Sequence, residues 1–207
     1  GSTGHQVNYN SEFFSKASGG GAGGVLDGGI AGKLQIEFDA VGTGDARGPV
    51  SEGQGNDLTY ALQAGLNFED ASQKILIESV MTNAWSGADA QAGQEQGIYF
   101  GTGTQFDFAQ FNFAINDAGE PVVIVTIELN DTIAFQQEYA APGLDDGVAD
   151  TDMVMRVVVD RDAGTVTPVW EYVSNAGVQT GTAGALSLDL LAPGEGNSLL
   201  DALAGAN

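Results

Sequence analysis

The sequence has no cysteine, a single histidine and only six basic residues among its 207 positions. The lack of cysteine excludes disulfides and thiolate metal ligands. Because the one histidine, His5, lies near the N-terminus, few pairs of a nucleophile and a general base can be assembled. No apolar run approaches the ~20 residues of a membrane-spanning helix. These absences argue against an enzyme and against insertion into a membrane.

Acidic residues are abundant instead. The chain contains 28 Asp and Glu, which give it a formal net charge of −22 and a pI of about 4.1. Such a surface repels nucleic acids and anionic lipids, so no nucleic-acid partner is expected. The partners that remain are divalent cations, neutral ligands such as sugars, and uncharged or basic protein segments.

Short strands are predicted along most of the chain. Glycine accounts for 31 residues, many of them in pairs or clusters between apolar runs, which is typical of tight turns. Apolar and polar residues alternate in about ten segments, with turn signals every ~8–15 residues. The clearest segments are residues 33–40, 74–81, 122–129, 153–159 and 165–173. The pattern predicts an all-β fold, specifically a two-sheet antiparallel β-sandwich.

The chain is expected to comprise two parts. Residues 1–32 are predicted to form an N-terminal edge strand, over residues 7–15, and a flexible Gly-rich arm, over residues 18–32. Residues 33–207 are predicted to form the β-sandwich domain.

One predicted strand contains four phenylalanines of mixed parity. Phe106 and Phe108 share one parity, whereas Phe111 and Phe113 share the other. A continuous strand would place the two pairs on opposite faces, so a β-bulge near Ala109 is expected to return all four to the core.

A second predicted strand has large apolar side chains on both of its faces. We expect Val169 and Val173 to face the core, which leaves Trp170 and Tyr172 on the outer face. Pro168 lies in the same strand and indicates a strand edge or a bulge, because proline has no N–H to give to a neighbouring strand.

Four segments resemble a known family of β-sandwiches: KILIESVMTN, EQGIYFGTG, FAQFNFAI and the hairpin MVMRVVVDRDAGTVTPVWEYV. They are similar to the concanavalin A-like lectin and laminin-G-like jelly rolls of bacterial extracellular proteins. The resemblance implies a jelly roll, often carrying calcium, that binds glycans or links surface proteins. It also implies an extracellular or cell-surface location.

Glycoside hydrolases share that fold, and those of the laminarinase group carry Glu-x-Asp-x-x-Glu on one strand. Such spacing places three carboxylates on one face. The sequence lacks the motif, because Glu78 and Glu171 each lie in a strand without a partner acid two residues on. The fold alone therefore does not predict an enzyme, and a hydrolase is only a third interpretation.

A calcium site is one interpretation of the acidic segment LDDGVADTD. It holds four aspartates, namely Asp145, Asp146, Asp150 and Asp152. Calcium takes six to eight oxygen ligands, which carboxylates and backbone carbonyls of such a loop can supply. The alternative is a solvated acidic loop. At Asp45, Asp57 and Asp89, three further acids in long loops, a turn-forming role is favoured over a cation site.

Two groups of residues are candidates for contact with a ligand. In the first, Trp85 offers an aromatic plane to a sugar ring, and Asn83, Asp89 and Gln91 offer hydrogen bonds to its hydroxyls. The alternative for Trp85 is that it closes the end of the sandwich core.

The second group lies on the last predicted hairpin. Trp170 and Tyr172 form a ligand platform if their face is open, or lie beneath the Gly-rich N-terminal segment if it is covered. Arg156 could bind a ligand carboxylate through both guanidinium nitrogens, although pairing with an acid of a neighbouring strand is the simpler role.

The sequence thus predicts a noncatalytic, calcium-dependent extracellular module that binds carbohydrate or a cell-surface polymer. The alternative is an adhesin or structural module that binds protein or peptide, or that assembles with itself by exchange of the N-terminal strand.

Overall fold

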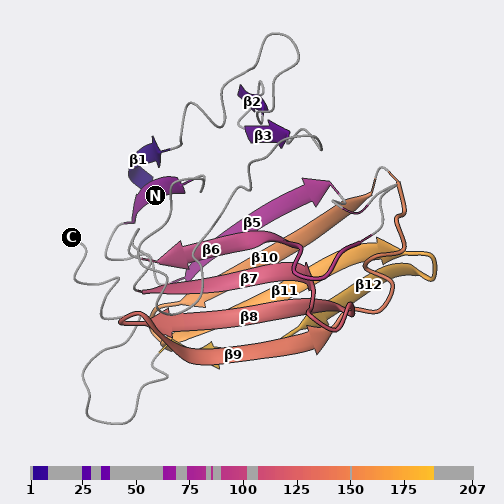
Figure 1. Cartoon of the computed structure of the whole chain (residues 1–207). Helices are drawn as coiled ribbons and strands as arrows, with labels where there is room; N and C mark the ends of the chain where they lie inside the picture. Colours follow the sequence, from indigo (N-terminus) through magenta and orange to yellow (C-terminus); the bar gives the residue numbers. More distant parts are fainter. Residues whose placement is uncertain are drawn as a thin grey trace. The chain divides into compact units, whose positions relative to one another are not determined.

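A computed structural model describes the chain in several segments, namely residues 2–8, 25–28, 34–37, 63–68, 74–82, 85, 90–101, 107–149 and 151–188. Within these segments every regular element is a β-strand, and all pairs of strands are antiparallel (Figure 1). The chain divides into two compact units, one of residues 1–50 and 56–69 and one of residues 51–55 and 70–207. The division therefore falls near residue 70 and not at residue 33, the boundary predicted from the sequence.

Two separate strand pairs lie among the described residues of the first unit. β1 (Ser2–Asn8) pairs with β4 (Gln63–Phe68), and β2 (Val25–Gly28) pairs with β3 (Leu34–Glu37). Because β2 lies inside the segment expected to be a flexible arm, that expectation is wrong for these four residues. The apolar residues Val25 and Leu26 lie in this short strand, and the glycines around them favoured the prediction of a flexible segment.

The predicted strand at residues 33–40 is confirmed over the length of β3. The predicted edge strand at residues 7–15 overlaps β1 at its first two residues only, and residues 9–15 lie outside the described part of the chain.

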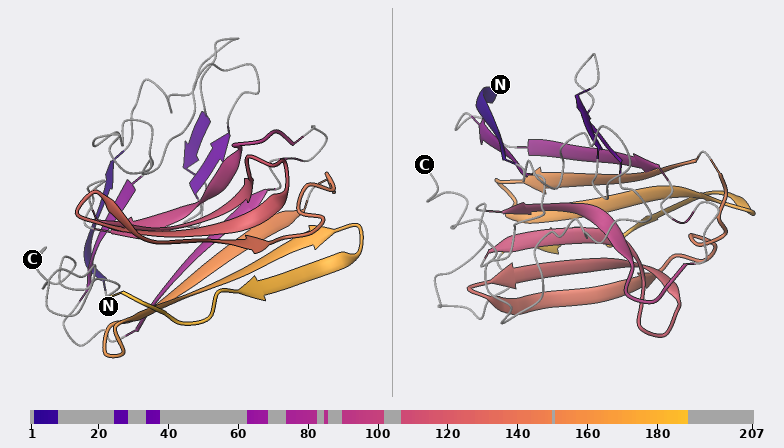
Figure 2. Two further views of the ribbon diagram at one scale, coloured as in Figure 1. Left: turned by 60° about the horizontal axis from the view of Figure 1, so that its bottom comes forward. Right: turned by 45° about the horizontal axis from the view of Figure 1, so that its top comes forward.

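The second unit contains two antiparallel sheets, drawn as separate layers in Figure 2. The five-stranded sheet has the order β12-β11-β10-β5, with β13 also paired to β11, and the four-stranded sheet has the order β6-β7-β8-β9. The strands of the first sheet are β5 (Lys74–Thr82), β10 (Asp152–Asp160), β11 (Thr165–Ser174), β12 (Gly177–Thr182) and β13 (Leu186–Ser187). Those of the second are β6 (Glu95–Gly101), β7 (Phe108–Ile115), β8 (Pro121–Leu129) and β9 (Thr132–Ala140).

Alternate residues of both sheets meet in one hydrophobic core. The four-stranded sheet contributes buried side chains that include Phe111, Phe113, Val123, Val125, Ile127 and Leu129. The five-stranded sheet contributes Met81, Met153, Met155, Val157, Val159, Val166, Trp170 and Tyr172. Since burying one such side chain contributes about 1.5–3 kcal/mol, this shared core is the main favourable term in the stability of the unit. The described part of the second unit is therefore all-β and sandwich-like, as the alternation of its sequence predicts.

Turn chemistry fixes the register of the hairpins. Asn130 and Asp131 both have positive φ, 54° and 59°, and join β8 to β9 in a two-residue turn whose twist matches that of the strands. Gly164 ends the turn between β10 and β11 with a φ of 60°.

The predicted β-bulge at Ala109 is wrong. β7 keeps an uninterrupted register with both of its neighbours, so Phe108 faces one side of the sheet and Phe111 and Phe113 face the other. All three are nonetheless buried, because both faces of this central strand are covered at that point. The irregularity lies instead between β8 and β9, where Ile127 pairs with Phe135 and the next residue of β8 pairs with Ile133.

Pro168 occupies a local gap in the sheet. On one side it lies opposite Val157 of β10, while on the other side β12 has ended at Thr182 and β13 begins only at Leu186. The missing N–H of proline therefore removes no bond from a continuous ladder, in agreement with the edge position that the sequence predicts.

Gly181 makes room for the largest side chain of the core. It lies directly opposite Trp170, and a Cβ added to it would lie 2.4 Å from the indole Nε1. Only a residue without a side chain lets the indole lie across β12 at this position.

We expect Gly181→Ala to lower the stability of the second unit, since the indole must move out of its packed position. Overpacking of this kind costs about 1–3 kcal/mol, which corresponds to a fall of the unfolding midpoint of roughly 2–4 °C for each kcal/mol in a chain of this size. Thr180→Ala, on the exposed neighbour in the same strand, is the control and should change the midpoint little. Equal midpoints for the two variants in thermal unfolding would show that Gly181 does not carry this constraint.

Candidate functional site

The aromatic residues predicted to contact a ligand belong to the core. Trp85 is 2% exposed, Trp170 4% and Tyr172 3%. The indole Nε1 of Trp85 donates a hydrogen bond to the side-chain oxygen of Gln94 at 2.9 Å, so both its ring and its polar atom are satisfied internally. The alternative in which Trp85 is a core residue is confirmed.

The prediction that Trp170 and Tyr172 face outward is wrong. Met155 lies directly opposite Trp170 across the hairpin, and residues directly opposite share a face of the sheet. Because Met155 faces the core, Trp170 must do so as well, whereas Val169 and Val173 lie on the outer face. Counting back from the turn at Gly164 would have given this register from the sequence.

The rings of these residues join the two sheets. Tyr139 of β9 packs against Trp170 with ring centroids 5.6 Å apart, and Phe113 meets Tyr172 edge-on at 6.3 Å. Burial raises the pKa of Tyr139, and burial followed by the nearby carboxylate of Asp146 raises the pKa of Tyr172. Both phenols therefore stay neutral in the core at physiological pH.

Arg156 pairs with acids of the neighbouring strands. Its Nε lies 2.6 Å from a carboxylate oxygen of Glu78, and its Nη1 lies 4.0 Å from a carboxylate oxygen of Glu171. The simpler of the two predicted roles is confirmed, and these contacts hold the guanidinium against its own sheet.

Of the other predicted ligand contacts, Gln91 is exposed. Its backbone N–H donates to the same side-chain oxygen of Gln94 that accepts from Trp85. Asn83 and Asp89 lie outside the described residues.

The acidic loop acts as a structural support. The carboxylate of Asp146 accepts a hydrogen bond from the backbone N–H of Asn175 at 2.7 Å and so holds the turn between β11 and β12. In the same loop the backbone carbonyl of Pro142 accepts a hydrogen bond from the Tyr172 hydroxyl at 3.1 Å. Neither of the two sequence interpretations anticipated this role, because it depends on a turn that lies about thirty residues further along the chain.

The four aspartates of the calcium prediction are not gathered by the described structure. Asp145 is exposed in the loop, Asp152 is exposed at the start of β10, and Asp150 lies outside the described residues. Nowhere in the described segments do three Asp, Glu or His side chains form a group that could hold a metal ion.

The outer face of the four-stranded sheet carries a set of residues that sequence reasoning missed. Register places Tyr99 opposite Gln110, Gln110 opposite Thr126, and Thr126 opposite Gln136. These four residues, which we call the polar row, cross all four strands β6, β7, β8 and β9 on the face away from the core. The amide nitrogen of Gln136 lies 3.2 Å from the Thr126 hydroxyl, to which it donates.

A second row lies beside the polar row along the strands. Asn112 lies opposite Gly97 on one side and opposite Ile124 on the other, and Ile124 in turn lies opposite Glu138. The Asn112 amide donates to Glu95 and fills the space above Gly97, where a Cβ would lie 2.2 Å from the amide oxygen.

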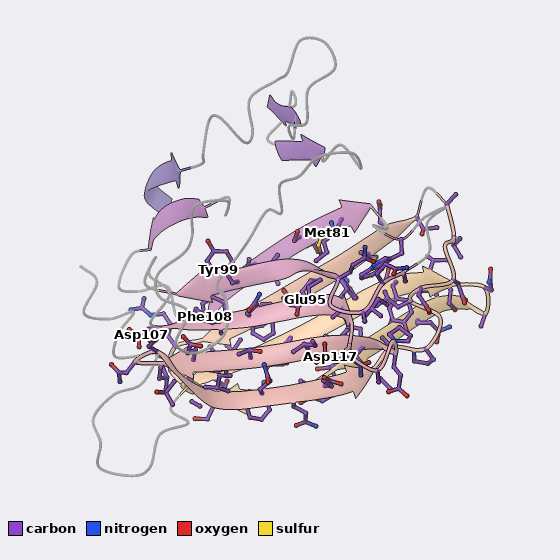
Figure 3. The ribbon with its side chains drawn as sticks, in the orientation of Figure 1. Met81, Glu95, Tyr99, Asp107, Phe108 and Asp117 are labelled. Atoms are coloured by element: carbon purple, nitrogen blue, oxygen red, sulfur yellow. The ribbon has the colours of Figure 1, made fainter. Side chains whose placement is uncertain are left out.

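One end of this face is open and the other is closed. Glu95 and Glu138 are exposed, whereas Phe108 is 1% and Glu128 0% exposed at the opposite end (Figure 3 labels Glu95, Tyr99 and Phe108). At the end that carries Glu95 and Glu138, Gln136 is exposed and Gln110 half-buried, whereas Thr126 and Asn112 on the same face are only 5% and 6% exposed. The signal in the sequence was the segment FAQFNF, in which the amides Gln110 and Asn112 alternate with Phe111 and Phe113.

In the comparisons with known proteins, no family model, no curated protein and no solved structure matches this chain. No helix within the described segments is long and apolar enough to cross a membrane.

We expect Asp146→Ala to lower the stability of the second unit by about 1 kcal/mol, since the Asn175 N–H loses its partner. The fall of roughly 2–4 °C in the unfolding midpoint should be the same in chelator and in calcium. Asp145→Ala removes the same charge from the exposed neighbour and is the control. A loss that occurs only in calcium would contradict the supporting role and make Asp146 a metal ligand.

Proposed function

We propose that this chain is a noncatalytic binding module for neutral glycans, and that the polar row on the four-stranded sheet contacts the sugar. The observation that carries the proposal is the chemistry of that row. Four neighbouring strands place a phenol, two amides and a hydroxyl side by side, in a protein whose charged residues are mostly acids. The amides are the accessible groups, since Thr126 is 5% exposed and the Tyr99 hydroxyl is buried.

Neutral sugars fit this inventory. An amide offers both a donor and an acceptor, so Gln110 and Gln136 can each bond two sugar hydroxyls. Tyr99 adds an aromatic surface for the C–H face of a pyranose. The net charge of −22 disfavours acidic polysaccharides and nucleic acids but leaves neutral ligands unaffected.

The spacing of acids on the described face supports binding over hydrolysis. Glu138 lies directly opposite Ile124, and Ile124 lies four residues from Glu128 along β8. Glu138 and Glu128 are therefore roughly 14 Å apart. Glu95 lies three strands away from Glu138, again roughly 14 Å. Glycosidases need two carboxyl groups about 5–9.5 Å apart.

The finer identity of the module is part of the same proposal. The resemblance of four strand segments to concanavalin A-like and laminin-G-like jelly rolls agrees with two antiparallel sheets around one core. It supports a lectin-like module that acts outside the cell, on a glycan or a cell-surface polymer.

We expect Gln110→Ala and Gln136→Ala to weaken binding of neutral polysaccharides by about 2- to 10-fold for each hydrogen bond lost. Affinity electrophoresis of the whole chain through soluble glucans, mannans and galactans identifies the ligand and measures the change. Thr180→Ala, on the outer face of the five-stranded sheet, should bind like the parent chain. Retardation that is unchanged in both amide variants, or absent for every polysaccharide, would overturn the proposal.

Calcium dependence is a separate part of the proposal, based on the aspartates of the loop before β10. A cation site filled at a hundred times its Kd adds about 2.7 kcal/mol. We expect calcium to raise the unfolding midpoint at fixed ionic strength by roughly 5–10 °C over chelator in that case, and magnesium to raise it less. Equal midpoints in chelator, magnesium and calcium would remove calcium from the account while leaving glycan binding untouched.

A further inference from the structure

β5 lies at one end of the five-stranded sheet and, among the described strands, pairs on one side only, with β10. It is nine residues long, contains no proline, and exposes Leu76 at 63% and Val80 at 56% on the outer face of the sheet. A long edge strand with exposed apolar side chains is a template for another strand. The exposed edge of β5 therefore favours pairing with a strand of another molecule.

We propose that the edge of β5 that pairs with no described strand pairs antiparallel with β5 of a second copy of this chain, around a two-fold axis at Leu76. This occupant is favoured because β5 is complementary to itself in that register. Leu76 then faces Leu76 of the other copy, Lys74 faces the other copy's Glu78, and Ile75 faces its Ile77.

The charges already present beside the edge continue this pattern. Lys74 lies 2.9 Å from Asp160, and Glu78 lies 2.6 Å from Arg156. Across the seam the signs would alternate from Asp160 through Lys74 to the other copy's Glu78 and Arg156. Opposite charges that face each other across strands stabilise a pair, and like charges destabilise it.

The neighbouring registers lack this match. With the axis at Glu78, the two Glu78 carboxylates face each other. With the axis at Ile77, Lys74 faces Val80 and Leu76 faces Glu78. In the first register the apolar row runs unbroken from Val158 of β10 through both Leu76 side chains to the other copy's Val158. The axis at Glu78 also gives an apolar pair, Leu76 with Val80, so it is the facing carboxylates that disfavour that register.

The same edge must overcome the repulsion between two copies of net charge −22. Association is therefore expected to be weak and to strengthen as salt screens the long-range repulsion, since the Debye length falls below ~10 Å above 0.1 M salt. The short-range pairs at the seam select the register more than they supply affinity.

Sedimentation equilibrium of the whole chain, from micromolar to millimolar concentration in about 0.3 M salt, tests the proposal. The parent chain should show a monomer–dimer equilibrium. Leu76→Lys should raise the dimer dissociation constant at least tenfold. Val178→Lys is the matched control, because Val178 is 64% exposed on the outer face of β12, at the other end of the sheet, and it should leave the constant unchanged.

A pair of charge reversals tests the register. Lys74→Glu and Glu78→Lys should each weaken the dimer, although they change the net charge in opposite directions. An equimolar mixture of the two variants should form the heterodimer, since every seam pair is then opposite in sign. A parent chain that stays monomeric to 1 mM, or a dimer that none of the three β5 variants weakens, would overturn the proposal.

Discussion

Tyr139 of the four-stranded sheet packs against Trp170 of the five-stranded sheet, and Phe113 meets Tyr172 beside them. These contacts commit one face of every central strand to a shared core. Aromatic pairs of this kind add about 0.5–1.5 kcal/mol beyond the area they bury. Gly181 allows the arrangement, because the indole lies where a side chain of β12 would otherwise stand. Within the two described sheets, the outer faces and the edges lie outside this core.

The two outer faces differ in their chemistry, and the roles proposed for them differ accordingly. On the five-stranded sheet, Arg156 binds Glu78 and Lys74 binds Asp160, with exposed aliphatic side chains between the pairs. The hydrogen bond to Lys74 holds the pKa of Asp160 below its usual value, so this pair remains ionised in mildly acidic solution. Such a face favours contact with protein, and its charges are already committed.

The four-stranded sheet instead presents amides and hydroxyls in line. Its acids lie at the periphery, where Glu95 receives the Asn112 amide and Glu138 receives that of Asn116. A neutral, hydroxyl-rich ligand is the partner that this face can bind without displacing an internal ion pair.

Much of the fold could be predicted because alternation of apolar and polar residues is a local signal. The strands at 74–82, 121–129, 152–160 and 165–174 follow directly from it. The orientation of Trp170 was missed because valines and aromatic residues alternate in β11, so hydrophobicity alone does not choose a face, and only the register with β10 decides. β2 was missed because a four-residue strand in a Gly-rich segment carries almost no periodicity.

The candidate site was harder to predict for a related reason. Gln110 and Gln136 are unremarkable polar residues in their own strands, and become a row only when three hairpin registers bring them together. The loop tryptophan and the loop aspartates were predicted as ligand contacts because tryptophan is typical of sugar sites and aspartate of calcium sites. Trp85 and Asp146 are instead satisfied within the molecule, the first in the core and the second at a turn.

The proposal that the outer face of the four-stranded sheet binds a neutral glycan can be tested by NMR. The measurement is a titration of the isotope-labelled chain with neutral gluco-, manno- and galacto-oligosaccharides, followed by backbone and side-chain amide chemical shifts. We expect the largest shifts on the side-chain amides of Gln110 and Gln136 and on the backbone of β6. Shifts confined to β5, β10 and β11, or no saturable shift with any of the sugars, would rule it out.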